Sequence, residues 1–307
     1  MTTSMILHHY EASPYAEKIR LMFGHTNSSW ASLTSPAWPP RPNVDPLSGG
    51  YRRIPIAQVG ADIFCDSWLI AKEISAATDC KELDPASVEG DAKTLMDKAE
   101  LEGFFSAITS VPPTKLLGTM LRNFGPIGAY RFVKDRSGIL KGGTTKPETG
   151  DGAKAVMSEI FSTLDGMTAN REWLSGDGPS IADLTVYHPI WLHLNCGGAF
   201  PKEAKNALAW FDRVAAIGEG DRKEIGQADA FAAARDNDPR PLPESMNIGD
   251  LELGATVRVA PQDYGVVPVT GSLAAATEER LILAREADDF GTVHVHFPRT
   301  GYAAGPA

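Results

Sequence analysis

The length, composition and charge of this chain limit what it can be. Its 307 residues exceed what one compact core usually holds, so two or three domains are expected. A net charge of −10 argues against nonspecific binding to nucleic acid or to an anionic membrane, and no apolar run is long enough to span a bilayer. Three widely spaced cysteines argue against a disulfide framework or a zinc site, and the first residues lack a signal-peptide pattern. These features favour a cytoplasmic protein.

The first 80 residues predict an α/β unit. Ser13 and Pro14 predict the start of a helix, because a hydroxyl suits the N-cap and proline suits the first helical position. The pair Gly60-Ala61 predicts a hairpin between two short strands. The predicted elements in chain order are a strand (5–10), a helix (14–24), a strand (28–33), an irregular proline-rich loop (35–50), two strands (54–59 and 62–65) and a helix (66–77).

The rest of the chain changes character twice. After a linker at 81–90, the pattern is helical to about residue 236, with an exposed loop predicted at 141–152. Beyond 246, β-type runs are predicted at 256–260, 265–270, 280–285 and 292–297, with turns at 263–265 and 288–291. The predicted domains are therefore an α/β domain (1–80), an all-helical domain (91–236) and a small β-rich extension (246–307).

Three short motifs of the first domain stand in a recognisable order. They are Ser13-Pro14 at the first helix, Arg53-Ile54-Pro55 opening a strand, and Asp66-Ser67 opening the next helix. This order resembles the glutathione S-transferase family, whose thioredoxin-like first domain carries these features, and the hydroxyl-then-proline form is similar to its serine-type classes. The run from Trp173 to Gly176, followed by Ser180 and Asp183, resembles a motif of the family's all-helical second domain. The resemblance covers about residues 5 to 235.

The resemblance implies glutathione as co-substrate, with Ser13 as the activating residue. A thiol conjugates as its thiolate, and a hydroxyl donor at a helix N-terminus stabilises that anion. Tyr10 is a rival activator, because other branches of the family use a tyrosine at the end of the first strand. The plain alternative for Ser13 is a helix cap worth about 1 kcal/mol; the accompanying motifs outweigh it.

The other motif residues are expected to hold the tripeptide. Pro55 resembles the family's cis-proline, which lets Ile54 pair with the cysteinyl backbone as an added strand would. Asp66 is expected to accept the γ-glutamyl ammonium, and Ser67 with the helix N–H groups to bind its carboxylate. Arg53, or Arg52 in its place, is expected to neutralise the glycine carboxylate.

Two other groups of residues are expected to serve structure. Ser180 and Asp183 are interpreted as a capping box, in which side chains satisfy the free backbone donors of a helix start. His294 and His296 share one face of a predicted strand, but no third or fourth metal ligand can be placed from the sequence, so no metal is expected.

The chain departs from the family pattern in two places. The loop at about 34–51 carries five prolines where many relatives place a helix and a glutathione-contacting side chain, which leaves the glycine end of the ligand open. The extension after 245 has no counterpart in the two-domain pattern. It is expected to cover the substrate cleft, to join a dimer, or to do neither.

The sequence thus predicts a glutathione transferase in which the thiolate attacks an electrophilic, hydrophobic small molecule, with homodimerisation and a detoxification role implied by the resemblance. A specialised glutathione-dependent lyase, etherase, dehalogenase or isomerase uses the same thiolate and stays open. So does a non-catalytic glutathione-binding scaffold. The sequence does not identify the electrophile.

Overall fold

The computed structural model describes residues 4–246, 251–287 and 289–307. The first part of the chain contains β1 (Ile6–His9), α1 (Pro14–His25), β2 (Ser29–Thr34), α2 (Asp45–Ser48), β3 (Ile56–Val59), β4 (Asp62–Cys65) and α3 (Ser67–Thr78). The helical part contains α4 (Gly90–Lys98), a π-helical segment (Ala99–Gly103), α5 (Phe104–Thr109), α6 (Pro113–Arg136), α7 (Gly150–Thr168), α8 (Ile181–Asn195) and α9 (Lys205–Ala215). The remaining elements are β5 (Asp221–Glu224), α10 (Gln227–Arg235), β6 (Thr256–Pro261), β7 (Val269–Ala276), β8 (Arg280–Ala287), β9 (Gly291–Pro298) and β10 (Tyr302–Pro306).

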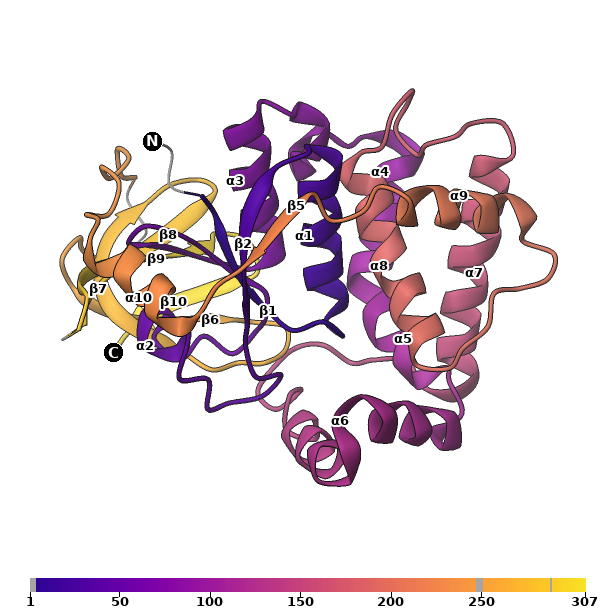
Figure 1. Ribbon diagram of the computed structural model, residues 1–307, viewed down its shortest axis with the longest axis horizontal. Helices are drawn as coiled ribbons and strands as arrows, with labels where there is room; N and C mark the ends of the chain where they lie inside the picture. Colours follow the sequence, from indigo (N-terminus) through magenta and orange to yellow (C-terminus); the bar gives the residue numbers. More distant parts are fainter. Residues whose placement is uncertain (1–3, 247–250, 288) are drawn as a thin grey trace.

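Figure 1 shows the helical part at one end of the molecule, the β-rich extension at the other, and the first part between them. The first part therefore contacts both neighbours, with α1 packed on α8 of the helical part and β4 paired with β9 of the extension. Among the described residues, no helix combines the length and the apolar character needed to cross a membrane.

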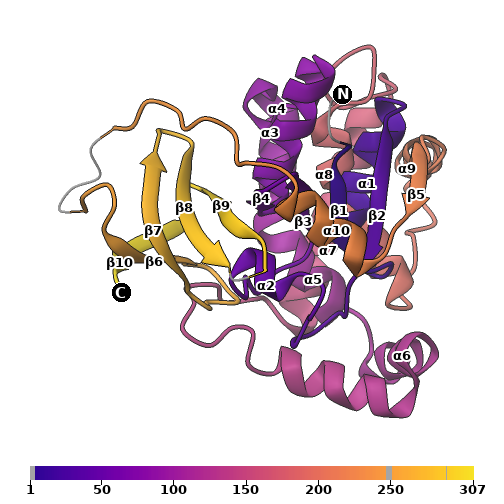
Figure 2. The ribbon, with the colours of Figure 1, turned by 60° about the vertical axis from the view of Figure 1, so that its left-hand side comes forward.

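A single sheet runs through the first part and the extension. Its strand order is β10-β6-β7-β8-β9-β4-β3-β1-β2-β5. The junction is a parallel pairing of β9 with β4, in which His294 lies opposite Asp62. Figure 2 shows the extension strands following on from this edge. The extension thus covers a strand edge that would otherwise present unpaired backbone groups.

Side-chain alternation along the central strands explains why both faces of the sheet are covered. Successive residues of a strand point to opposite faces. Leu7, Ala57 and Phe64 belong to the core that includes α1 and α3, whereas Ile56, Ile63 and Cys65 belong to a second core. Extension residues supply most of that second core, among them Val257, Leu283, Val295 and Phe297. The extension and the first part therefore share one hydrophobic core as well as one sheet.

The predicted elements of the first part are confirmed within a few residues. Ser13 caps α1 with Pro14 in its first turn, Asp66 caps α3, and the Ile54–Pro55 peptide bond is cis, as the resemblance implied. The loop expected to lack regular structure contains the four-residue helix α2, which is a correction. It forms because the Asp45 carboxylate accepts the Arg41 backbone N–H and so fixes the turn.

The helical part follows its prediction up to residue 215, except that α7 begins at Gly150, inside the loop predicted at 141–152. Ser180 and Asp183 form the predicted capping box at the start of α8. The helical pattern expected up to 236 is interrupted by β5, which pairs with β2 and returns the chain to the sheet. Helix α10 then packs on β3. All four residues of β5 are charged, so its strand character comes from pairing rather than from an apolar pattern.

In the extension, the strands predicted at 256–260, 280–285 and 292–297 are confirmed as β6, β8 and β9. The strand predicted at 265–270 was placed too early, because β7 spans Val269–Ala276, and β10 was missed. The predicted turn at 288–291 falls partly on Asp288, which lies outside the described residues.

Candidate active site

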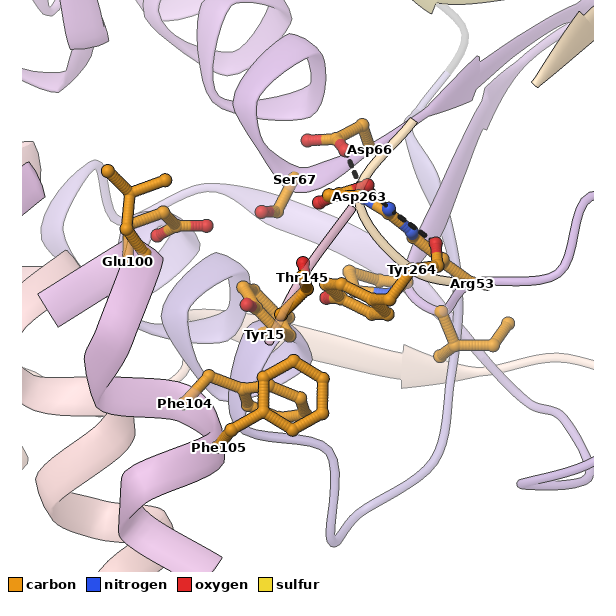
Figure 3. Close-up of a pocket in the computed structure, with 13 residues that line it drawn as sticks. Tyr15, Arg53, Asp66, Ser67, Glu100, Phe104, Phe105, Thr145, Asp263 and Tyr264 are labelled. Carbon is orange, nitrogen blue, oxygen red and sulfur yellow. Dashed lines mark hydrogen bonds and ion pairs between the residues drawn. The ribbon is translucent and has the colours of Figure 1, made fainter. Parts of the chain in front are cut away.

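Two adjoining cavities lie where the first part, the helical part and the extension meet. The first, shown in Figure 3, has a volume of about 150 Å³ and is bordered by Pro55, Asp66 and Ser67. The second has a volume of about 390 Å³ and is bordered by Tyr10 and Ser13. Both cavities share the lining residues Tyr15, Arg53, Ile54, Phe104, Phe105 and Tyr264.

The structure therefore brings the residues named from the sequence to one region but not to one cavity. Arg53, Ile54, Pro55, Asp66 and Ser67 gather in the first cavity. Ser13 and its rival Tyr10 line the second, together with Arg53 and Ile54. The shared residues form the partition between the two groups.

Ser13 is held rigidly at the start of α1. Its side chain is almost fully buried, with 1% of its surface exposed, and its Oγ accepts the Ala16 backbone N–H at 3.3 Å. Because Oγ acts as acceptor in this bond, the hydroxyl proton stays available for another acceptor. Ser13 can thus cap the helix and at the same time donate a hydrogen bond to an anion in the second cavity.

A cluster of arginines lies beside Tyr10. The Tyr10 hydroxyl is 3.4 Å from Arg136 Nη2, and both Arg136 and Arg52 form ion pairs with the single carboxylate of Asp135. Burial and the neighbouring Arg136 lower the pKa of Arg52 from its ordinary value, yet an arginine stays protonated at neutral pH. Two cations and one anion leave a net positive charge at the wall of the second cavity.

Arg53 connects the motif residues to the extension. It forms ion pairs with Asp66, at 3.4 Å, and with Asp263, and it donates a hydrogen bond to the Tyr264 carbonyl at 2.7 Å. Burial alone would lower its pKa, but the surrounding tyrosines and Asp66 raise it above the ordinary value, so Arg53 is a permanent cation. Arg52, the alternative named from the sequence, points instead to Asp135 and the second cavity.

Asp66 already has several partners. Its Oδ1 accepts the Trp68 backbone N–H at 3.0 Å, as an N-cap does. Its Oδ2 accepts the Tyr302 hydroxyl at 2.9 Å and faces Arg53. Tyr302 belongs to β10, so the extension contacts two of the predicted site residues. An ionised carboxylate has about four acceptor positions, which leaves Asp66 able to accept a further cationic donor.

Sequence reasoning missed the aromatic residues of the partition. Burial raises the pKa of Tyr15 well above its ordinary value and raises the pKa of Tyr264 to about 12. Both phenols are therefore neutral donors at neutral pH. The signal at 263–265 identified the correct turn, but no local pattern showed that this turn contacts Arg53, which lies 210 residues before Asp263 in the sequence. The Phe104-Phe105 pair lies within a helical pattern, which gives no sign that its rings line a cavity.

The histidines of β9 acquire a third neighbour in the fold. Asp62 of β4 accepts a hydrogen bond from His296 Nε2 at 2.8 Å, and its Oδ1 is 3.9 Å from His294 Nδ1. One ligand atom of each of the three residues lies within 4.8 Å of the others. The second carboxylate oxygen of Asp62 accepts the Arg240 backbone N–H at 2.9 Å. These bonds make the cluster a buried link between the first part and the extension.

Comparison with known proteins places these features in a family. The model for the glutathione S-transferase N-terminal domain matches residues 7–81, and the model for the C-terminal domain matches residues 124–217. A search of the curated proteins found no match.

Among solved structures, a GST-like protein from Pseudomonas syringae is 30% identical, with 98% of this chain and 100% of that chain covered and a TM-score of 0.74. A glutathione S-transferase from Sinorhizobium meliloti is 14% identical over 69% of this chain and 87% of its own, with a TM-score of 0.48. Rice GST1, solved in complex with glutathione, is 14% identical over 75% of this chain and 95% of its own, with a TM-score of 0.46.

Proposed function

Since the chain belongs to the glutathione S-transferase family, we propose that it is an enzyme that binds glutathione and transfers its thiolate to an electrophilic, hydrophobic small molecule. Ser13 is the residue that stabilises the thiolate. The observation that carries this proposal is the position of the Ser13 hydroxyl. It is buried at the N-terminus of the 12-residue helix α1, on the wall of the larger cavity, with its proton not used by the capping bond.

The electrostatics around Ser13 favour an anion. The N-terminus of a helix carries a partial positive charge of about half an electron, and Arg52 and Arg136 add a net positive charge nearby. A hydrogen bond to a charged group contributes about 1.5–3 kcal/mol. Because 1.36 kcal/mol corresponds to one pKa unit, one such bond lowers the pKa of a bound thiol by about one to two units.

The first cavity is proposed to hold the γ-glutamyl end of the peptide. Asp66 accepts its ammonium, and Ser67 with the first N–H groups of α3 binds its carboxylate. The Ile54 backbone, next to Pro55, pairs with the cysteinyl residue, and Arg53 neutralises a peptide carboxylate. The cysteinyl thiol then extends past Ile54, which borders both cavities, toward Ser13.

The second cavity is proposed to hold the electrophile. Its walls are mainly apolar side chains from the helical part, including Ile108, Met120, Phe132, Leu140 and Leu192. Such a lining suits an apolar or aromatic molecule. Homodimerisation, a cytoplasmic location and a role in detoxification belong to the same proposal, on the strength of family membership.

Turnover of an activated aryl halide with glutathione tests the proposal. We expect Ser13→Ala to lower kcat/KM by about 10- to 100-fold, as loss of 1.5–3 kcal/mol of thiolate stabilisation implies, while the dissociation constant for glutathione stays within about twofold. Tyr10→Phe is the matched variant on the same cavity and should retain most activity. Equal losses in both variants would assign the role to Tyr10 as well.

Two outcomes contradict the proposal. If wild-type protein binds glutathione but turns over no electrophile, the chain is a glutathione-binding scaffold. If it does not bind glutathione at all, the assignment of both cavities is wrong.

A further inference from the structure

A turn of the extension forms part of the wall of the first cavity. The turn, Gln262–Gly265, connects β6 to β7 and places Asp263 and Tyr264 among the cavity-lining residues. Figure 3 shows the Asp263 carboxylate next to Asp66, with which it shares Arg53 as a partner, and the Tyr264 ring beside Arg53. The extension therefore supplies a carboxylate to the same arginine that is proposed to receive a carboxylate of the peptide.

Tyr264 fills space as well as binding Arg53. Its ring lies 4.1 Å from the Arg53 guanidinium carbon, is stacked with the Phe104 ring at 6.0 Å and meets the Phe105 ring edge-on at 5.2 Å. Each such contact with a cation or an aromatic ring is favourable. Together they hold Tyr264 in the partition between the two cavities.

The turn is fastened to the helical part by main-chain bonds. Gly265 N–H donates to the Ile139 carbonyl at 2.6 Å, and Thr144 and Thr145 N–H donate to the Gln262 and Asp263 carbonyls at 2.9 and 3.1 Å. A Cβ atom at Gly143 would lie 1.8 Å from the Asp263 carbonyl oxygen, so this close approach requires glycine. The helical part therefore holds the turn over the cavity through its α6–α7 connection.

The first cavity is small for a ligand site. Sites for small molecules usually measure about 300–1,000 Å³, and the first cavity, at about 150 Å³, is smaller. A peptide that reaches from Asp66 to Ser13 has to cross the partition that contains Tyr264. In the Arg53–Asp263 ion pair, 45% of the Asp263 side-chain surface but only 14% of the Arg53 side-chain surface is accessible. A competing carboxylate can therefore reach Arg53 only when Asp263 moves away from it.

We propose that Asp263 and Tyr264 act as an internal ligand of the glutathione site, which an incoming peptide carboxylate displaces from Arg53, and that they thereby determine which thiols the site accepts. This inference rests on the proposed function. A thiol without a carboxylate cannot replace Asp263 on Arg53. The extension thus selects acidic peptide thiols over neutral ones of similar size.

Calorimetric titration with glutathione tests the inference. A ligand whose competent state is only partly populated binds with an apparent affinity reduced by that fraction. Replacing Asp263 by Asn removes one partly exposed ion pair, so we expect the dissociation constant to fall about two- to fivefold. Tyr264→Ala removes the ring contacts and the barrier without changing charge, and we expect a fall of about tenfold.

Two control variants and a kinetic measurement distinguish displacement of Asp263 and Tyr264 from general effects of changing charge or removing a tyrosine. Asp289→Asn makes the same charge change in the extension away from the site, and Tyr130→Ala removes an exposed tyrosine of α6. Both should leave the dissociation constant unchanged. In stopped-flow binding, the observed rate in wild type should reach a plateau at high glutathione, set by release of the Asp263 and Tyr264 side chains from Arg53, and in Tyr264→Ala it should rise linearly.

The outcomes distinguish this inference from the proposed function. Unchanged or weaker binding in folded Tyr264→Ala, with binding retained by wild type, overturns the inference and leaves the proposed function standing, because Tyr264 would then contact the ligand or be neutral. Absence of glutathione binding in wild type and in every variant overturns both. Far-UV circular dichroism verifies folding of each variant, and Tyr264→Phe, which keeps the ring, should behave as wild type.

Discussion

The first part and the β-rich extension share one sheet and one core, yet their sequences carry information of different kinds. In the first part, two helix caps and a proline at a strand start mark the candidate site directly. In the extension, the strands can be recognised but their purpose cannot, because it depends on the pairing of β9 with β4. The comparison teaches that a segment can contribute residues to a candidate site without carrying any motif of its own.

Deletion of residues 246–307 should have the largest effect on stability, because it removes one of the two regions compared. It would uncover the β4 edge and expose Ile56, Ile63 and Cys65, which pack against the extension. Full burial of an isoleucine side chain contributes about 1.5–3 kcal/mol, so exposure of these residues removes a large share of the 5–15 kcal/mol by which domains are usually stable. We expect insoluble or aggregated protein. A soluble truncated chain with unchanged thermal midpoint would mean that the extension is an independent appendage.

Substitution of Asp183 in the helical part should cause the next largest loss of stability. Asp183 is fully buried and accepts bonds from the Leu174 and Ser180 N–H groups and from Trp210 Nε1. Asp183→Ala leaves these donors unsatisfied, so we expect a loss of about 3–5 kcal/mol in the free energy of unfolding. Urea denaturation measures it. Asp229→Ala removes the exposed capping carboxylate of α10 and should cost about 1 kcal/mol; equal losses would contradict the account.

Substitution of Asp62, at the junction of β4 and β9, should cost less stability than substitution of Asp183. Burial would raise the pKa of Asp62, but the hydrogen bonds from His296 and Arg240 lower it below the ordinary value. Asp62→Asn keeps the size but turns one acceptor into a donor that faces the Arg240 N–H. We expect a loss of about 1–3 kcal/mol. Asp289→Asn is the exposed control, and a junction variant as stable as this control would show that the link is dispensable.

Mild acid should destabilise the first part gradually. Burial lowers the pKa of His8 to about 4 and of His9 to about 3, from 6.5 in the unfolded chain. Below pH 6.5 the unfolded chain therefore binds more protons, so stability is fully present above pH 6.5 and falls toward pH 4. Each histidine contributes about 1.4 kcal/mol per pH unit in that range.

Urea denaturation from pH 7 to pH 5 measures this slope. His8→Gln removes one of the histidines whose pKa folding lowers and should reduce the slope by about 1.4 kcal/mol per pH unit below pH 6. An unchanged slope in this variant would show that His8 does not drive the acid sensitivity.

The features that the sequence predicted are those formed by residues close together in the chain. The caps at Ser13 and Asp66 and the capping box at Asp183 involve residues two or three positions apart, so their patterns are local. The β5 strand, the third group beside His294 and His296, and the position of Tyr264 all depend on contacts between residues about 190 or more positions apart. In the sequence, Asp62 looks like an ordinary strand residue, because its contact with the two histidines depends on the pairing of β9 with β4. No periodicity encodes such a pairing.

The most direct test of the central claim is the ultraviolet thiolate absorbance of glutathione bound to the protein, titrated against pH. A free cysteine thiol has a pKa of about 8.5, and we predict that binding lowers the pKa of the glutathione thiol by about one to two units in wild type. In Ser13→Ala, glutathione should still bind and its thiol pKa should return toward about 8.5. An equally lowered pKa in Ser13→Ala would contradict the assignment of Ser13 as the residue that stabilises the thiolate.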